Sequence, residues 1–218
     1  MATYADLKTR IITETSRDDL ADDLADILDQ HVADACIEYS DMRFWFNQSI
    51  QAVATVAGTI TVALPAPMRI IDRLAGPYAD LTPVTLDDYP DYGDFAADAT
   101  GLPSRYTYIN GQLRFDITPD AVYNMTAYGL LQIDPPAVDA DDNVWTNEAR
   151  ALIIARTKMT LARDVFRDQD GVVLAQAGVQ DNLTKLQRET QRRLRTRSAA
   201  QLVRPNGQPV RRAYLDRL

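Results

Sequence analysis

The sequence predicts an α+β protein: a helical bundle with an inserted antiparallel β-sheet or sandwich and an extended C-terminal arm. Three observations support this fold class. Apolar residues recur at helical spacing near both ends, they alternate in β-branched runs in the middle, and the last stretch has few apolar residues. The predicted parts are the N-terminal helices (1–47), the β domain (48–134), a linker with a helical hairpin (135–198) and the arm (199–218).

Two helices are expected in the N-terminal part. The first spans 4–15, and Ser16 followed by Asp19 resembles a capping box for the second. Between residues 20 and 42, apolar side chains recur at helical spacing and acidic side chains fall on the opposite side. We therefore expect a long amphipathic helix with an acidic face. That face comprises Asp22, Asp26 and Asp29.

The middle of the chain is expected to form five or six short strands. Asn110-Gly111, flanked by alternating apolar residues, predicts a two-residue type I′ hairpin. Gly58 is a predicted turn, and the acidic stretch 80–101 is a predicted loop. The remaining strands are predicted at 51–57, 59–64, 68–74 and 122–131.

The C-terminal half predicts two helices, 147–167 and 172–198, joined by a turn at 168–171 into a helical hairpin. The segment 134–143 before them is a predicted linker. Its three acids favour a solvated linker over a cation site. The last helix carries a basic stripe beside its apolar one. The stripe comprises Lys185, Arg188, Arg192 and Arg195, and the linker acids are Asp139, Asp141 and Asp142.

Charge divides the chain. The net charge is −8, but residues 1–142 hold 8 Lys and Arg against 24 Asp and Glu, whereas residues 143–218 hold 15 against 7. The two parts therefore carry −16 and +8. Such a division predicts surfaces with different electrostatic partners, and copies of one chain could pair head to tail through it.

The sequence predicts neither catalysis nor a cofactor. It has no Gly-rich phosphate loop, and its single histidine, His31, does not allow a His-pair metal site. His31 and the single cysteine, Cys36, lie on the apolar side of the predicted helix, where structural roles are expected. Paired carboxylates among the 31 acids stay an open alternative, because nothing marks out one pair. No apolar run reaches the roughly 18 residues of a membrane span.

The arm, 199–218, has Leu202, Val203 and Tyr214 as its candidate apolar anchors, and it has four arginines. Ordering each residue costs about 1–2 kcal/mol, more than these anchors return alone. We therefore expect the arm to be held by a partner. The basic stripe raises the alternative of a nucleic-acid-binding module, but the acidic first part of the chain favours a protein-docking surface.

Several stretches, taken in order, resemble the head–tail adaptor (connector) proteins of tailed bacteriophages. The resemblance spans nearly the whole chain and depends on the order of the pieces. They are Arg43-Phe-Trp-Phe-Asn-Gln-Ser49, Gly58, Leu64-Pro65 with Met68-Arg69, Gly101-Leu-Pro-Ser-Arg-Tyr106, Trp145-Thr-Asn147 and Leu186-Gln-Arg-Glu-Thr190 before an arginine-rich tail.

The resemblance implies a virion structural protein of the neck, assembled in the host cytoplasm. Such proteins form a dodecameric ring that binds below the portal, extends the DNA channel and gives the tail a platform. Implied partners are further copies, the portal protein and the next neck or tail protein, with DNA only passing through. The nearest alternative is a tail-completion or neck protein, and an unrecognised hydrolase is a more distant one.

Three sets of residues are assigned to these contacts. The arm is expected to dock on the portal, the acidic helix face to line the channel and repel DNA phosphates, and an aromatic loop to face the tail. The arm residues are Leu202, Val203, Arg204, Arg211, Arg212 and Tyr214. The channel residues are Asp22, Asp26 and Asp29, and the loop residues are Tyr89, Tyr92 and Phe95.

Overall fold

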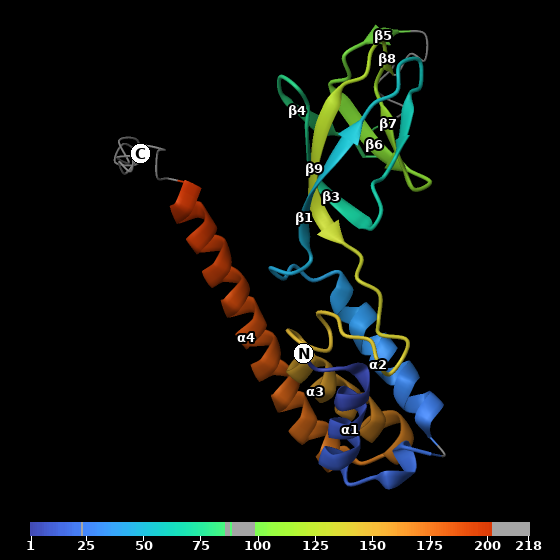
Figure 1. Cartoon of the computed structure of the whole chain (residues 1–218), viewed down its shortest axis with the longest axis vertical. Helices are drawn as coiled ribbons and strands as arrows, with labels where there is room; N and C mark the ends of the chain where they lie inside the picture. The colour runs from blue at the N-terminus through green and yellow to red at the C-terminus, as the bar shows by residue number, and fades with distance from the viewer. Residues whose placement is uncertain (23, 86–87, 89–98, 202–218) are drawn as a thin grey trace. The chain divides into compact units, whose positions relative to one another are not determined.

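The computed structural model describes residues 1–22, 24–85, 88 and 99–201, with the backbone alone for 195–201 (Figure 1). The chain divides into two compact units. A helical unit combines Met1–Phe46 with the chain from Asp134 onward, and a β unit comprises Asn47–Ile133. The α+β fold class predicted from the sequence is therefore confirmed.

Helix α1 (Tyr4–Thr15) has the predicted bounds, but its capping differs from the prediction. A capping box at its start joins Thr3 and Asp6, whose side chains each accept a hydrogen bond from the other's backbone N–H. The box predicted at Ser16 and Asp19 is wrong. Ser16 instead ends α1 in the left-handed conformation, with φ of 53°, and Asp19 pairs with Arg17 at 2.7 Å.

Helix α2 (Ala25–Ser40) is shorter than predicted. A 3₁₀ turn, η1 (Asp18–Leu20), and further turns precede it. The turn at η1 directs Leu20 into the core, where its exposed fraction is 0%. Asp22 therefore lies before α2, and the three predicted acids do not share one helical face.

The C-terminal part contains α3 (Arg150–Leu161) and α4 (Gln169–Gln201), which agree with the predicted helical hairpin to within a few residues. The end of α3 continues into one π-helical turn, η2 (Ala162–Phe166). Arg167 then takes the left-handed conformation, which ends this helix and lets α4 return alongside it. Helix α3 packs against α1, α2 and α4 and is the centre of the unit.

The β unit is a mixed sheet of seven strands, in the order β1-β9-β3-β4-β6-β7-β2. The wholly antiparallel sheet predicted from the sequence is wrong, because β4 and β6 are parallel and a separate pair, β5 and β8, is also parallel. The strands are β1 (Gln48–Ala54), β2 (Thr61–Ala63), β3 (Met68–Ala75), β4 (Asp80–Pro83), β5 (Thr100–Gly101), β6 (Arg105–Ile109), β7 (Gln112–Phe115), β8 (Thr118–Pro119) and β9 (Asn124–Leu131).

The stretch 80–101 explains the difference. It was predicted as a loop, yet it begins with β4 and ends with β5. It connects β4 to β6, and such a crossover allows two adjacent strands to run in the same direction. An acidic, proline-containing sequence hides these short strands, which depend on their partners in the sheet for their hydrogen bonds.

The predicted hairpin at Asn110-Gly111 is confirmed. Both residues have positive φ, 53° and 77°, as a type I′ turn requires. Tyr106 and Phe115, which are paired in its strands, lie in the core of the β unit. The turn therefore fixes which residues of β6 and β7 face that core.

The β unit enters and leaves at neighbouring points. Its first strand, β1, pairs antiparallel with its last, β9, with Gln48 opposite Leu130. The pairing continues one step further, since the Leu131 N–H donates to the Asn47 carbonyl at 2.8 Å. The β unit therefore begins and ends in paired segments.

Candidate protein-interaction site

The segment after α2 is anchored by aromatic contacts. The Phe44 ring stacks on Phe46 at 5.2 Å between centroids, and Phe46 meets Trp145 edge-on at 5.8 Å. Phe44 and Trp145 are fully buried. On α4, the Arg193 guanidinium lies 4.4 Å from the centroid of the Trp45 ring, a cation–π contact. Three motifs that are far apart in the sequence therefore meet in the helical unit.

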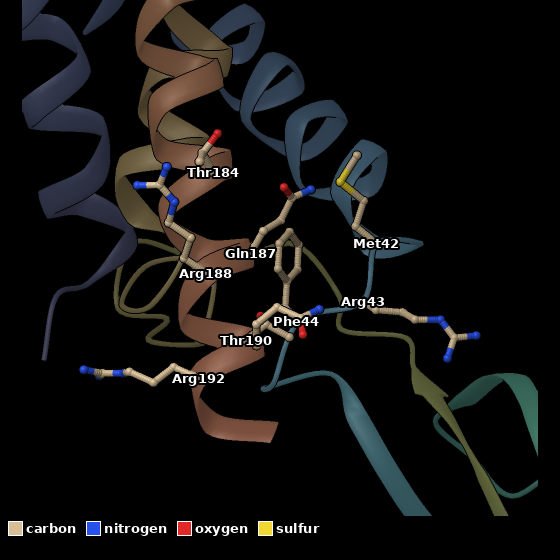
Figure 2. A pocket seen from close by; sticks show the side chains of 9 residues that line it. Met42, Arg43, Phe44, Thr184, Gln187, Arg188, Thr190 and Arg192 are labelled. Carbon is tan, nitrogen blue, oxygen red and sulfur yellow. The ribbon is translucent and has the colours of Figure 1, made fainter. Parts of the chain in front are cut away.

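Beside these aromatic residues is an open groove of about 940 Å³, here called the arginine groove. Residues 42–44 line one side, and α4 between Thr184 and Arg192 lines the other. Figure 2 shows Phe44 at its centre, with Arg43 projecting on one side and Arg188 and Arg192 projecting from successive turns of α4 on the other.

The arginine groove is basic. Three arginines and no carboxylates occur among its lining residues in the described part of the chain. The neighbouring Glu189 accepts hydrogen bonds from Arg192 and Arg193, both at 2.8 Å, and these bonds lower the pKa of Glu189. Arg188 is exposed and forms no ion pair within the described residues. The groove therefore suits an acidic partner surface.

The predicted basic stripe on α4 is divided by the structure. Arg188 and Arg192 border the groove, whereas Lys185 pairs with Asp181 at 2.6 Å one turn earlier. The side chain of Arg195 lies outside the described residues. Sequence reasoning found the arginines but missed the groove, because Phe44 joins them only in the fold. The signal available in the sequence was the aromatic run from Phe44 to Phe46.

The acids predicted to line a channel are in different environments. Asp29 accepts a hydrogen bond from the Tyr4 hydroxyl at 2.7 Å, and it forms an ion pair with Lys8 at 3.3 Å. Burial and this hydrogen bond raise the pKa of the Tyr4 phenol. Asp22 and Asp26 are exposed. Asp29 is therefore held by partners within its own helical unit, unlike the other two acids, whose side chains are more exposed.

The predicted solvated linker is an anchored segment. The backbone N–H of Tyr4 donates to the Asp141 carbonyl at 2.9 Å, and Lys8 binds the Asp139 carboxylate at 2.6 Å. The Asp141 carboxylate accepts the N–H groups of Val138 and Ala137, which lowers the pKa of that carboxyl. These acids therefore attach 134–143 to the start of α1. No group of three metal-binding side chains occurs in the described residues.

The motif Gly101-Leu-Pro-Ser-Arg-Tyr106 has a structural role in the β unit. Asp116, which is buried, accepts hydrogen bonds from the backbone N–H of Ser104 at 3.1 Å and from its hydroxyl at 2.6 Å. Arg105 lies 3.7 Å from the same carboxylate. Sequence reasoning did not single out Asp116, because its partners precede it by a hairpin.

The single cysteine and the single histidine both lie on α2. Cys36 is buried in α2, and burial raises the pKa of its thiol to about 12, as expected of a structural cysteine. His31 is half-buried on the same helix. The predicted arm residues beyond α4 and the aromatic residues of the predicted tail-facing loop lie outside the described residues. They comprise Leu202, Val203, Arg204, Arg211, Arg212 and Tyr214, and Tyr89, Tyr92 and Phe95.

The sequence motifs thus hold structural segments together, and the helical unit carries a basic groove. The family model of the SU10 adaptor protein matches residues 2–209, so the chain belongs to that family and the resemblance to phage head–tail adaptors is confirmed. No curated protein matches the chain.

Membership of this family makes the chain a bacteriophage adaptor protein, and such membership implies a structural role. Its partners therefore belong to the head–tail region of the phage. Among the described helices, none combines the length and the apolar character that crossing a membrane requires.

Proposed function

We propose that the protein forms a homo-oligomeric ring, a dodecamer, that binds below the portal, extends the DNA channel and provides the platform for the tail or the next neck protein. The observation that carries this proposal is the match of the adaptor family to residues 2–209, nearly the whole chain. The division of charge supports it, because ring subunits need two different complementary surfaces.

The C-terminal arm is proposed to dock on the portal. Residues 199–201 form the end of α4 and residues 202–218 follow it in the sequence. The three apolar anchors of the arm do not compensate for the entropy lost on ordering. A portal surface would supply the missing contacts. The aromatic side chains of the loop, Tyr89, Tyr92 and Phe95, are proposed to contact the tail.

The channel role is proposed for Asp22 and Asp26, which are exposed. Carboxylates near the channel repel DNA phosphates and keep the passing DNA from binding. Asp29 is bound to Tyr4 and Lys8, so a substitution of Asp29 would also remove contacts within the helical unit. Particles with Asp22→Asn and Asp26→Asn should eject DNA more slowly, and an unchanged ejection rate contradicts this role.

Native mass spectrometry of the full chain, with and without the purified portal protein of the same phage, tests the ring. The expected result is a complex with twelve copies per portal ring, and a chain that stays monomeric with the portal contradicts the proposal. Removing residues 199–218 should abolish this complex and leave the unfolding temperature of the helical unit unchanged. Normal joining of heads to tails by the shortened chain would refute the docking role of the arm.

A further inference from the structure

Helix α2 has one buried side, which packs in the helical unit, and one exposed side opposite to it. Gln30, Asp34 and Ile37, with the C-cap residue Asp41, recur at spacings of four, three and four residues, so they share one side, here called the outer face of α2. The opposite face, which includes Val32 and Cys36, is fully buried.

The outer face combines acidic charge with an apolar side chain. Ile37 is 55% exposed although it lies at the middle of the helical face. Asp34 is exposed and forms no ion pair within the described residues. An apolar side chain bordered by carboxylates has the composition of an interface anchor with a polar rim.

The arginine groove offers the matching features. Arg188 and Arg192 are one turn apart on α4 and supply positive charge, while Met42 is 37% exposed and supplies apolar surface. The outer face of α2 and the arginine groove thus have opposite charge, and both include apolar surface.

We propose that the outer face of α2 of one copy binds in the arginine groove of the next copy. This inference rests on the proposed ring and names its subunit contact. The two surfaces are different patches of one helical unit, so every copy offers one of each, and a contact between unlike patches can be repeated around a closed ring. A second copy fits the groove better than DNA does, since phosphates offer no apolar counterpart for its exposed Met42.

The contact has a predictable dependence on conditions. Exposed ion pairs contribute little individually and are screened beyond about 10 Å at 0.1 M salt. The ring should therefore assemble weakly in solution, more strongly on the portal, and less well as the salt concentration rises.

A charge exchange tests the contact with the full chain and the purified portal. The groove variant carries Arg188→Glu and Arg192→Glu, the face variant carries Gln30→Lys and Asp34→Lys, and the exchange variant carries all four. Each of the first two should raise the concentration for half-assembly by about tenfold or more, since attraction becomes repulsion. The exchange variant should recover assembly, because its two surfaces again have opposite charge.

The matched control carries Arg163→Glu and Lys185→Glu, the same change of total charge as in the groove variant but outside the groove. It should assemble like the wild type, and thermal unfolding of every variant checks that it folds. A second test is Ile37→Ala. Because Ile37 is exposed in the single copy, this change should weaken assembly several-fold and leave the unfolding temperature unchanged.

The outcomes separate the inference from the proposed function. If the wild type does not assemble, the proposed ring is wrong, and the proposed contact is wrong with it. If the wild type and the groove variant assemble equally, the ring stands and the inference is overturned. If the groove variant fails and the exchange variant does not recover, the groove binds the portal or DNA instead. Salt-sensitive DNA binding that is lost in the groove variant identifies DNA.

Discussion

The helical unit and the β unit reach their cores by different routes. The helical unit joins the two ends of the chain: the N–H of Ala2 donates to Asn147 at 2.8 Å, and the Arg150 guanidinium donates to the Asp6 carbonyl at 2.9 Å. The β unit is built from one continuous stretch, Asn47–Ile133, whose first and last long strands pair.

The two units are therefore stabilised by different sets of contacts. The strands of the β unit find their hydrogen-bond partners within one continuous stretch of sequence, whereas the helical unit depends on contacts between residues more than a hundred positions apart. We therefore expect substitutions in one core to unfold that unit first. Hydrogen exchange, measured separately for peptides of each unit, distinguishes the two responses.

The largest expected effect is that of Trp145→Ala. Trp145 is fully buried and contacts Phe46, so truncation should destabilise the helical unit by about 3–5 kcal/mol. Its counterpart, Phe115→Ala, removes a fully buried ring from the β unit and should have a similar effect there. If either substitution accelerates exchange equally in both units, the units unfold as one and the comparison is wrong.

A second pair contrasts glycines of the two units. A Cβ on Gly129, in β9, would lie 1.9 Å from the Ile70 carbonyl oxygen, so Gly129→Ala must push β3 and β9 apart at a cost of about 3 kcal/mol. A Cβ on Gly178, in α4, meets only Ala155 at 3.7 Å. Gly178→Ala should stabilise the helical unit by about 0.5–1 kcal/mol. Thermal unfolding followed by circular dichroism should show the opposite signs, and equal signs would contradict the packing at β9.

Asp116→Ala should cost the β unit about 2 kcal/mol, because it leaves the Ser104 N–H and hydroxyl without their acceptor. Asp80→Ala is the matched control in the same unit. Its carboxylate forms an exposed pair with Arg73 at 3.4 Å, and this pair should contribute less than about 1 kcal/mol. Urea unfolding measures both, and equal losses would mean that Asp116 has no special structural role.

The last contrast is a pH dependence located in the helical unit. Burial raises the pKa of Cys36 from 9.0 to about 12. The unfolded thiol therefore loses its proton first, and stability should fall as the pH rises from 9 to 12, by at most about 1.4 kcal/mol per pH unit. Cys36→Ala should lessen that slope without removing it, since the raised pKa of Tyr4 adds a loss above pH 10. Identical slopes for the two proteins would contradict the assignment to Cys36.

Local signals in the sequence were sufficient for the fold class, for α1 and for the hairpin at Asn110-Gly111. Helical periodicity and turn chemistry are short-range properties, so a single segment reveals them. The start of α2 was not predictable in the same way, because the periodic pattern continues through Leu20 while the chain turns there to bury it. The parallel pairing of β4 and β6 depends on a crossover that no local pattern records.

The sequence by itself determined the alternation of helices and strands and the division of charge between the two parts of the chain, since both follow from the order of side chains. It also identified the aromatic run and the arginines of the interaction site. Only the tertiary structure decided that Phe44 lies beside α4 and that Arg188 borders a groove. The physical reason is that these contacts join residues more than a hundred positions apart, and the packing of the whole helical core, rather than any local preference, selects them.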